Sequence, residues 1–148
     1  KELADLFERF GEEHAAKKIA RGIVERRKQS PITSTHDLAE LVRKLSYGGQ
    51  SIHPATRVFQ ALRIAVNDEL FVLEQALPKA LTLLKPGGRL VVISFHSLED
   101  RIVKRTFESF SKSGQGKIIT DKPIQATEQE VLQNRRARSA KLRTIEKL

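Results

Sequence analysis

The residues whose types could support chemistry gather in one short stretch, at Ser94, His96, Ser97 and Asp100. Hydroxyl, imidazole and carboxylate groups can transfer protons or bind a polar ligand. Their spacing lacks the Gly-x-Ser-x-Gly turn of serine hydrolases, so nucleophilic hydrolysis is not indicated. A metal site is not indicated either, because the four histidines are scattered and the chain has no cysteine. Ligand binding and proton transfer are the chemistry that fits.

A buried strand and a following helix are predicted to position these side chains. Residues 86–88 read Pro-Gly-Gly, which indicates a turn, and residues 90–95 form an apolar run rich in β-branched side chains. Such a run is typical of a strand that is covered on both faces. Ser97 can then cap a helix whose first turn holds Asp100. The polar residues would therefore lie at the carboxyl end of a strand, where open α/β sheets bind their ligands.

Helices are predicted for the first half of the chain. Ser-Pro at residues 30–31 separates the second predicted helix from the third, and Gly-Gly at residues 48–49 ends the third. The fourth is long, and we expect it to change direction near Asn67 and again at Pro78. These predictions rest on apolar residues that recur every three or four positions within residues 3–10, 16–23, 38–45 and 59–77.

After residue 88 the pattern changes to strand, helix, strand, helix and strand. A strand is predicted at residues 117–124, near a sheet edge because of Pro123, and a short helix is predicted to begin with a capping box at Thr127. The last strand is predicted at residues 140–145. No strand is predicted before residues 90–95, so the chain resembles the latter part of a larger α/β protein. Its unpaired sheet edge could join two copies into a homodimer.

The positive charge is concentrated in two regions. The formal net charge is +9, and residues 101–148 hold 12 Lys or Arg against 5 Asp or Glu. A second basic cluster at residues 17–28 has six positive residues and one Glu. Two such patches favour a polyanion partner contacted through phosphates, although solvated helix faces are the alternative for either patch alone. The densest basic run, which would suit phosphate contacts, consists of Arg135, Arg136, Arg138, Lys141 and Arg143.

Length and composition set the broad class. The 148 residues correspond to about one domain, and 39% hydrophobic residues are enough for a core. No run of 18 apolar residues and no secretory leader is found, so a membrane partner is not expected. We expect a cytoplasmic protein.

Six ordered motifs identify a family. They closely resemble the bacterial ribosomal RNA small-subunit methyltransferase H family, also called MraW, and the similarity runs over nearly the whole chain. The motifs are FGEE at residues 10–13, IHPATR with FQALR at 52–63, VNDEL at 66–70, PGGRL at 86–90, SFHSLEDRIVKR at 94–105 and RSAKLR at 138–143.

The resemblance implies a fold and an activity. The family is described as using S-adenosylmethionine to methylate the exocyclic N4 of a cytidine in small-subunit ribosomal RNA. Its α/β fold is a class I methyltransferase (Rossmann-like) sheet interrupted by a helical insertion. By this resemblance residues 1–54 are the insertion, which would recognise RNA, and residues 55–148 are the carboxyl-terminal part of the methyltransferase domain. The partner would be small-subunit ribosomal RNA or the immature small ribosomal subunit.

Residue roles follow from that chemistry. The N4 amine is a weak nucleophile, so the enzyme must orient it and give its proton a route. His96 is the best candidate for a base contact or proton route, and Asp100 could orient His96 or the amine. For His96 the alternative is hydrogen bonding that orders its loop, and for Asp100 it is helix capping, which we favour. The candidate substrate-binding residues are Arg57, Gln60, Arg63, Ser94, Ser97, Arg136, Arg138, Lys141 and Arg143.

Several alternatives stay open at this stage. A structural ion-pair role is as plausible for Arg57, Gln60 and Arg63 as a contact with RNA or cofactor. The family's glycine-rich loop does not occur in this sequence, so no cofactor-binding residue is assigned and the S-adenosylmethionine site is expected mostly outside residues 1–148. We therefore expect this chain to be inactive alone. The alternative function is a non-catalytic RNA-binding module.

Overall fold

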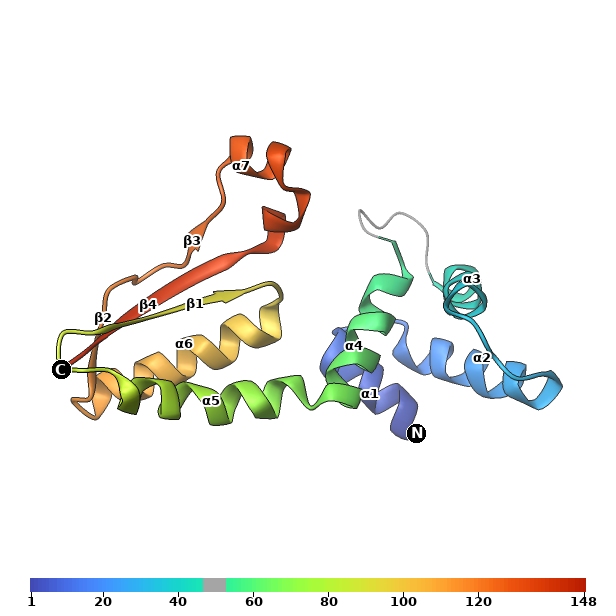
Figure 1. Cartoon of the computed structure of the whole chain (residues 1–148). Helices are drawn as coiled ribbons and strands as arrows, with labels where there is room; N and C mark the ends of the chain where they lie inside the picture. Colours follow the sequence, from blue (N-terminus) through green and yellow to red (C-terminus); the bar gives the residue numbers. More distant parts are fainter. Residues whose placement is uncertain (47–52) are drawn as a thin grey trace. The chain divides into compact units, whose positions relative to one another are not determined.

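The chain folds into two compact units. The computed structural model describes residues 1–46 and 53–148, so the predicted helix end at residues 48–49 lies outside the described residues. Unit 1 is Lys1–Glu69 and unit 2 is Leu70–Leu148 (Figure 1). The boundary between the units lies at residue 69, after the helix Ala55–Asn67. The boundary expected from the sequence is at residue 54, before that helix. None of the helices in the described residues combines the length and apolar composition needed to cross a membrane.

Unit 1 is built from helices, as the apolar spacing predicts. The break at residues 30–31 is confirmed, and Ser34 caps the third helix by accepting a hydrogen bond from the Asp37 amide at 3.0 Å. The long helix predicted over residues 59–77 is interrupted near Asn67, because Asp68 ends the fourth helix with a left-handed φ of 51°. The helices are α1 (Glu2–Gly11), α2 (Ala16–Gln29), α3 (Thr35–Leu45) and α4 (Ala55–Asn67).

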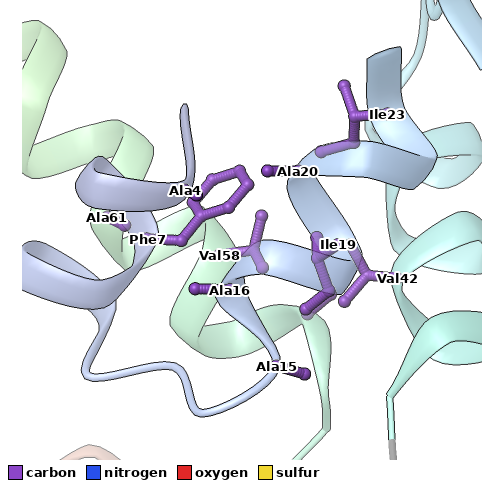
Figure 2. Packing of buried hydrophobic residues seen from close by; sticks show 11 residues of the cluster. Ala4, Phe7, Ala15, Ala16, Ile19, Ala20, Ile23, Val42, Val58 and Ala61 are labelled. Carbon is purple, nitrogen blue, oxygen red and sulfur yellow. The ribbon is translucent and has the colours of Figure 1, made fainter. Parts of the chain in front are cut away.

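The core of unit 1 is enclosed by these four helices. Phe7, Ile19, Val42 and Val58 are fully buried, and each comes from a different helix. Figure 2 shows these side chains gathered between the helices. Full burial of one such side chain contributes about 1.5–3 kcal/mol, so this cluster is the main stabilising feature of the unit.

Unit 2 alternates helices and strands. The single strand predicted at residues 117–124 is wrong in its extent, because two short strands form there instead. The change of direction predicted at Pro78 is also wrong, because the helix Glu69–Leu83 continues through this residue. The last strand and the short helix capped by Thr127 are confirmed. The elements are α5 (Glu69–Leu83), β1 (Arg89–Ser94), α6 (Ser97–Lys112), β2 (Gly116–Ile118), β3 (Ile124–Gln125), α7 (Glu128–Gln133), the 3₁₀ helix η1 (Arg135–Ser139) and β4 (Lys141–Lys147).

All the strand pairs in the described residues involve β4. It pairs antiparallel with β1 on one side and with β2 and β3 on the other, in the order β1-β4-β2. The register sets Ser94 opposite Lys141 and Val92 opposite Arg143. Directly opposite residues share a face, so these four side chains lie on one side of the sheet. The described part of the fold is therefore α/β with a small antiparallel sheet.

Among the described residues, helices cover one face of the sheet and leave the other open. The helices α5 and α6 lie on the same side of the strands (Figure 1), and their Leu77, Val103 and Phe107 pack with Ile145 of β4. On the opposite face Val91 and Ile93 remain 51% and 53% exposed. The prediction that this strand is covered on both faces is therefore not met within the described residues. Its side chains alternate in burial because only the face toward α5 and α6 has neighbours.

Candidate functional site

The loop between β1 and α6 is shaped by a capping box. The prediction that Ser97 caps α6 is wrong, because His96 is the N-cap and Ser97 is the first, exposed helical residue. The His96 Nδ1 accepts a hydrogen bond from the Glu99 amide at 3.3 Å. In return Glu99 Oε2 accepts from the amides of Phe95 at 2.8 Å and His96 at 3.3 Å. Two residues thus turn the chain directly from strand to helix.

The capping box defines what the His96 ring can do. An imidazole nitrogen that accepts a hydrogen bond carries no proton, so the proton of a neutral ring lies on Nε2. That nitrogen is 3.4 Å from Glu99 Oε1, and the side chain is 9% exposed. The arrangement agrees with the loop-ordering alternative. A direct catalytic role for His96 stays a prediction, and it requires the ring to leave its capping position before Nδ1 can accept a proton.

Asp100 forms the centre of a buried ion cluster. Its Oδ1 accepts from Arg143 Nε at 2.6 Å, and its Oδ2 accepts from Arg143 Nη2 at 3.2 Å and Lys141 Nζ at 3.3 Å. The side chains of Asp100 and Arg143 are 11% and 9% exposed. The favoured interpretation of Asp100 as a helix cap is wrong, because Glu99 fills that role and Asp100 bonds across to β4.

The ion cluster has electrostatic consequences. Hydrogen bonds from Arg143 hold the pKa of Asp100 below its ordinary value, and the charges of Arg143 and Lys141 act in the same direction against partial burial. Arg143 uses its guanidinium inside this cluster, so a structural role is supported for it, and its contact with a phosphate stays a prediction. Lys141 keeps a side-chain exposure of 37% and can still face a ligand.

The predicted residues of unit 2 meet at one end of its sheet. The register sets Ser94 opposite Lys141, beside the cluster of Asp100 and Arg143. Ser94 is 2% exposed, and its Oγ has no hydrogen-bond partner among the described residues. This is the carboxyl end of β1, as the sequence predicts.

Exposed arginines precede β4. Arg135, Arg136 and Arg138 belong to η1 and are all exposed, while Ala137 between them is buried and anchors the turn. Asn134 begins the turn by accepting a hydrogen bond from the Arg136 amide at 3.2 Å. Within the described residues these guanidinium groups have neither a hydrogen bond nor an ion pair. They form the surface best suited to phosphates, which we call the η1 arginines.

The predicted residues of unit 1 make structural contacts. Gln60 Nε2 donates to the Phe10 carbonyl at 3.1 Å, and Arg57 Nη1 donates to the Glu12 carbonyl at 3.3 Å. Both bonds tie α4 to the end of α1. Arg63 Nε pairs with Glu69 Oε1 at 2.9 Å. The structural alternative is therefore supported for all three residues, and their contact with RNA stays a prediction.

Sequence reasoning missed one functional detail. The role of Glu99 as the capping partner of His96 was not predicted from the sequence. The signal was present, because an acidic residue three positions after the cap is the spacing of a capping box. The density of arginine in residues 135–138 marked Arg135 in the sequence, and it lies with Arg136 and Arg138 on the exposed turn.

Comparison with known proteins identifies the family. Residues 1–148 match the model of the MraW methylase family. Proteins named "Ribosomal RNA small subunit methyltransferase H" are similar over 99% of the chain: 51% identical in Magnetococcus marinus and 52% in Coprothermobacter proteolyticus, where the match covers 52% and 49% of the relative. The protein of that name in Nostoc punctiforme is 54% identical over 99% of the chain and 48% of the relative. The chain spans about half the length of these curated relatives.

Proposed function

The chain belongs to the MraW methylase family, and we propose that it is the carboxyl-terminal portion of an enzyme that methylates cytidine N4 in small-subunit ribosomal RNA, with S-adenosylmethionine as methyl donor. The names of its relatives support a methyltransferase and a ribosomal RNA substrate. The choice of N4 rests on the family resemblance. The partner would be the ribosomal RNA or the immature small subunit, and the place of action the cytoplasm.

The glycine pair before β1 does not fit a nucleotide-type cofactor. A nucleotide-type cofactor is commonly held by backbone amides of a glycine-rich turn. The glycine pair before β1 has no such amide to offer, because Gly87 donates to the Lys147 carbonyl and Gly88 to the Lys85 carbonyl, both at 2.8 Å. We therefore assign no cofactor contact to this chain and propose that it supplies RNA binding and part of the substrate pocket.

The η1 arginines beside the carboxyl end of β1 carry this proposal. Arg136 and Arg138 are exposed, and within the described residues their guanidinium groups make no hydrogen bond or ion pair, so they can bind phosphates of the RNA. Lys141 lies at the start of β4, opposite Ser94 in the register. A nucleotide whose phosphate lies on these cations would bring its base toward the loop of Phe95 and His96. Holding the target amine there supplies the orientation that a weak nucleophile needs.

Asp100 acts in this scheme by positioning. It holds Arg143 and Lys141 against α6, so the start of β4 and the start of α6 keep a fixed spacing. The capping box of His96 fixes the loop between them. The residues of this chain thus bind and orient RNA, and no step of methyl transfer is assigned to Asp100.

Methyl transfer to unmethylated small-subunit ribosomal RNA tests the proposal. The chain alone should transfer no methyl group, and adding the amino-terminal half of a relative should restore transfer to the cytidine N4. Arg136→Ala with Arg138→Ala should then weaken RNA binding at least about tenfold and lower the salt dependence of binding. Lys112→Ala, which removes an exposed lysine at the end of α6, is the control for the effect of losing one positive charge elsewhere in unit 2.

A non-catalytic RNA-binding module is the second candidate. The exposed η1 arginines and the missing glycine cradle in the described residues favour it. RNA binding without methyl transfer, even with the amino-terminal half present, would support this alternative. Homodimer formation through the open edge of β1 is a separate expectation, and sedimentation that shows a monomer at every concentration would contradict it.

A further inference from the structure

The corner between α1 and α2 holds a buried carboxylate with one oxygen unused. Glu13 is 2% exposed and shapes this corner: its amide donates to the Phe7 carbonyl at 3.2 Å, and its Oε1 accepts from the Ala15 amide at 2.9 Å. Its Oε2 has no hydrogen-bond partner among the described residues. A buried carboxylate oxygen without a donor is unfavourable, so this atom points to a ligand or a bound water.

A cavity lies next to this carboxylate. It has a volume of about 760 Å³ and is lined by Glu13 and by charged residues of α1, α2 and α4. The cations are Lys17, Lys18 and Arg57, and Glu8 and Glu12 lie among them. Sites for small molecules range from about 300 to 1,000 Å³, so a nucleotide has room here. The mixed lining suits a ligand that carries both a negative charge and a hydrogen-bond donor.

The first turn of α2 carries positive charge, which is unfavourable at the amino end of a helix. Lys17 and Lys18 are exposed there, no acidic residue lies in that turn, and Ala15 caps the helix without a side-chain bond. Positive charge near the amino end of a helix opposes the helix dipole. A bound anion would make the arrangement favourable, because it would be attracted by the dipole and by the lysines together.

We propose that this corner is a ribonucleotide subsite of the RNA-binding surface. A phosphate lies at the first turn of α2 on Lys17, and a hydroxyl or amino group of the same nucleotide or its neighbour donates to Glu13 Oε2. The carboxylate selects a donor and the lysine attracts the backbone, so the subsite recognises RNA by two different interactions. The inference rests on the proposed function, since it takes RNA as the substrate.

Binding of a fluorescent fragment of small-subunit ribosomal RNA to the 148-residue chain tests this subsite. Glu13→Gln keeps an oxygen for the Ala15 amide and replaces the unused oxygen by a donor, so it should weaken binding about tenfold with an unchanged salt dependence. Lys17→Ala should weaken binding and lower the salt slope by about 0.7 to 0.9. Lys28→Ala, which removes the same charge in the last turn of α2 where Lys28 pairs with Glu25, is the control. Thermal melting followed by circular dichroism checks that each variant is folded.

The outcomes separate this subsite from the proposed function. If the penalty of Glu13→Gln disappears on a DNA fragment of the same sequence, the donor is a ribose 2′-hydroxyl; if it persists, the donor is a base amine, and both results support the subsite. If Glu13→Gln binds the RNA as tightly as the wild type does, the proposed subsite is wrong, because Glu13 Oε2 would then only bind water. A Lys17→Ala variant that loses no more than Lys28→Ala would overturn it as well. Absence of RNA binding by the wild-type chain would contradict both the subsite and the proposed RNA-binding role.

Discussion

The two units of this chain solve the problem of burial in different ways. Unit 1 encloses its apolar side chains between four helices, and Phe7 and Val58 are completely buried. Unit 2 covers one sheet face with α5 and α6 and leaves Val91 and Ile93 about half exposed on the other. It adds the buried ion cluster of Asp100, which has no counterpart among the described residues of unit 1.

This difference concerns function as well as stability. In unit 1 the polar residues that resemble family motifs mostly hold helices together, as Gln60 and Arg57 do at the end of α1. In unit 2 the exposed η1 arginines stay available while Asp100 and Arg143 are used internally. Sequence similarity therefore selects residues that hold the fold together as well as residues that are exposed to a ligand. The contacts in the structure distinguish the two groups.

The largest effect is expected at the ion cluster. Asp100→Asn leaves Arg143 buried without its carboxylate, so it should lower the free energy of unfolding by about 3–5 kcal/mol at neutral pH. Glu108→Gln on the same helix removes an exposed partner of Lys104, 3.7 Å away, and should cost less than about 1 kcal/mol. Urea titration followed by circular dichroism measures both. Equal costs would show that unit 2 does not depend on its buried pair.

The same substitution in the two units sharpens the contrast in burial. Val58→Ala removes two methyl groups from an enclosed core and should cost about 2–3 kcal/mol. Val91→Ala removes them from a half-exposed sheet face and should change stability by no more than about 0.5 kcal/mol. A large loss for Val91→Ala in urea titration would mean that the outer face of β1 is covered in solution, for example by a second copy of the chain.

Two glycines of unit 1 separate backbone packing from side-chain packing. A Cβ at Gly11 would lie 2.6 Å from the Arg57 carbonyl oxygen, so Gly11→Ala should push α1 from α4 and cost about 1–3 kcal/mol. A Cβ at Gly22 would meet the end of the Leu45 side chain, which can rotate away. Gly22→Ala should therefore be nearly neutral, because better helix propensity of about 1 kcal/mol offsets the contact. Comparable melting temperatures for the two variants would contradict this account.

The smallest effect is the pH dependence of the ion cluster. Because the pKa of Asp100 is lowered on folding, its contribution to stability is complete above the unfolded value of about 4 and is lost as the pH falls toward the folded value. The stability difference between wild type and Asp100→Asn should therefore be constant from pH 7 to about pH 5 and shrink below about pH 4. Urea titrations across this range measure it, and a difference that grows on acidification would have the wrong sign.

Local patterns predicted the elements well. Apolar spacing gave the helices of unit 1, and the β-branched run gave β1. The break at Ser30 and Pro31 and an irregularity near Asn67 were predicted correctly, because such breaks depend on the backbone preferences of the residues themselves. Pro78 was expected to redirect α5, yet the helix continues through it. Packing of Leu77 and Leu81 on the core of unit 2 favours the unbroken helix.

The roles of polar residues were harder to predict. Asp100 was interpreted from its spacing within α6, but its partner Arg143 lies 43 positions away. Gln60 bonds a carbonyl 50 positions away, and no local pattern reports such a contact. The position of the cap was missed by one residue, since Ser97 is a commoner cap than His96. Sequence spacing alone cannot tell which of two adjacent polar residues will end the strand and begin the helix.

The pairing of all the described strands with β4 has a consequence for the order of folding. Residues 4–61 supply the buried core of unit 1, so this unit can close as soon as they have been synthesised. The strand β1 must wait for β4, because Arg89 pairs with Glu146, 57 positions later. Contacts so distant in sequence form slowly, and intermediates that expose an unpaired strand edge tend to aggregate. During synthesis β1 therefore passes through a period in which its edge is unpaired and a chaperone can bind it.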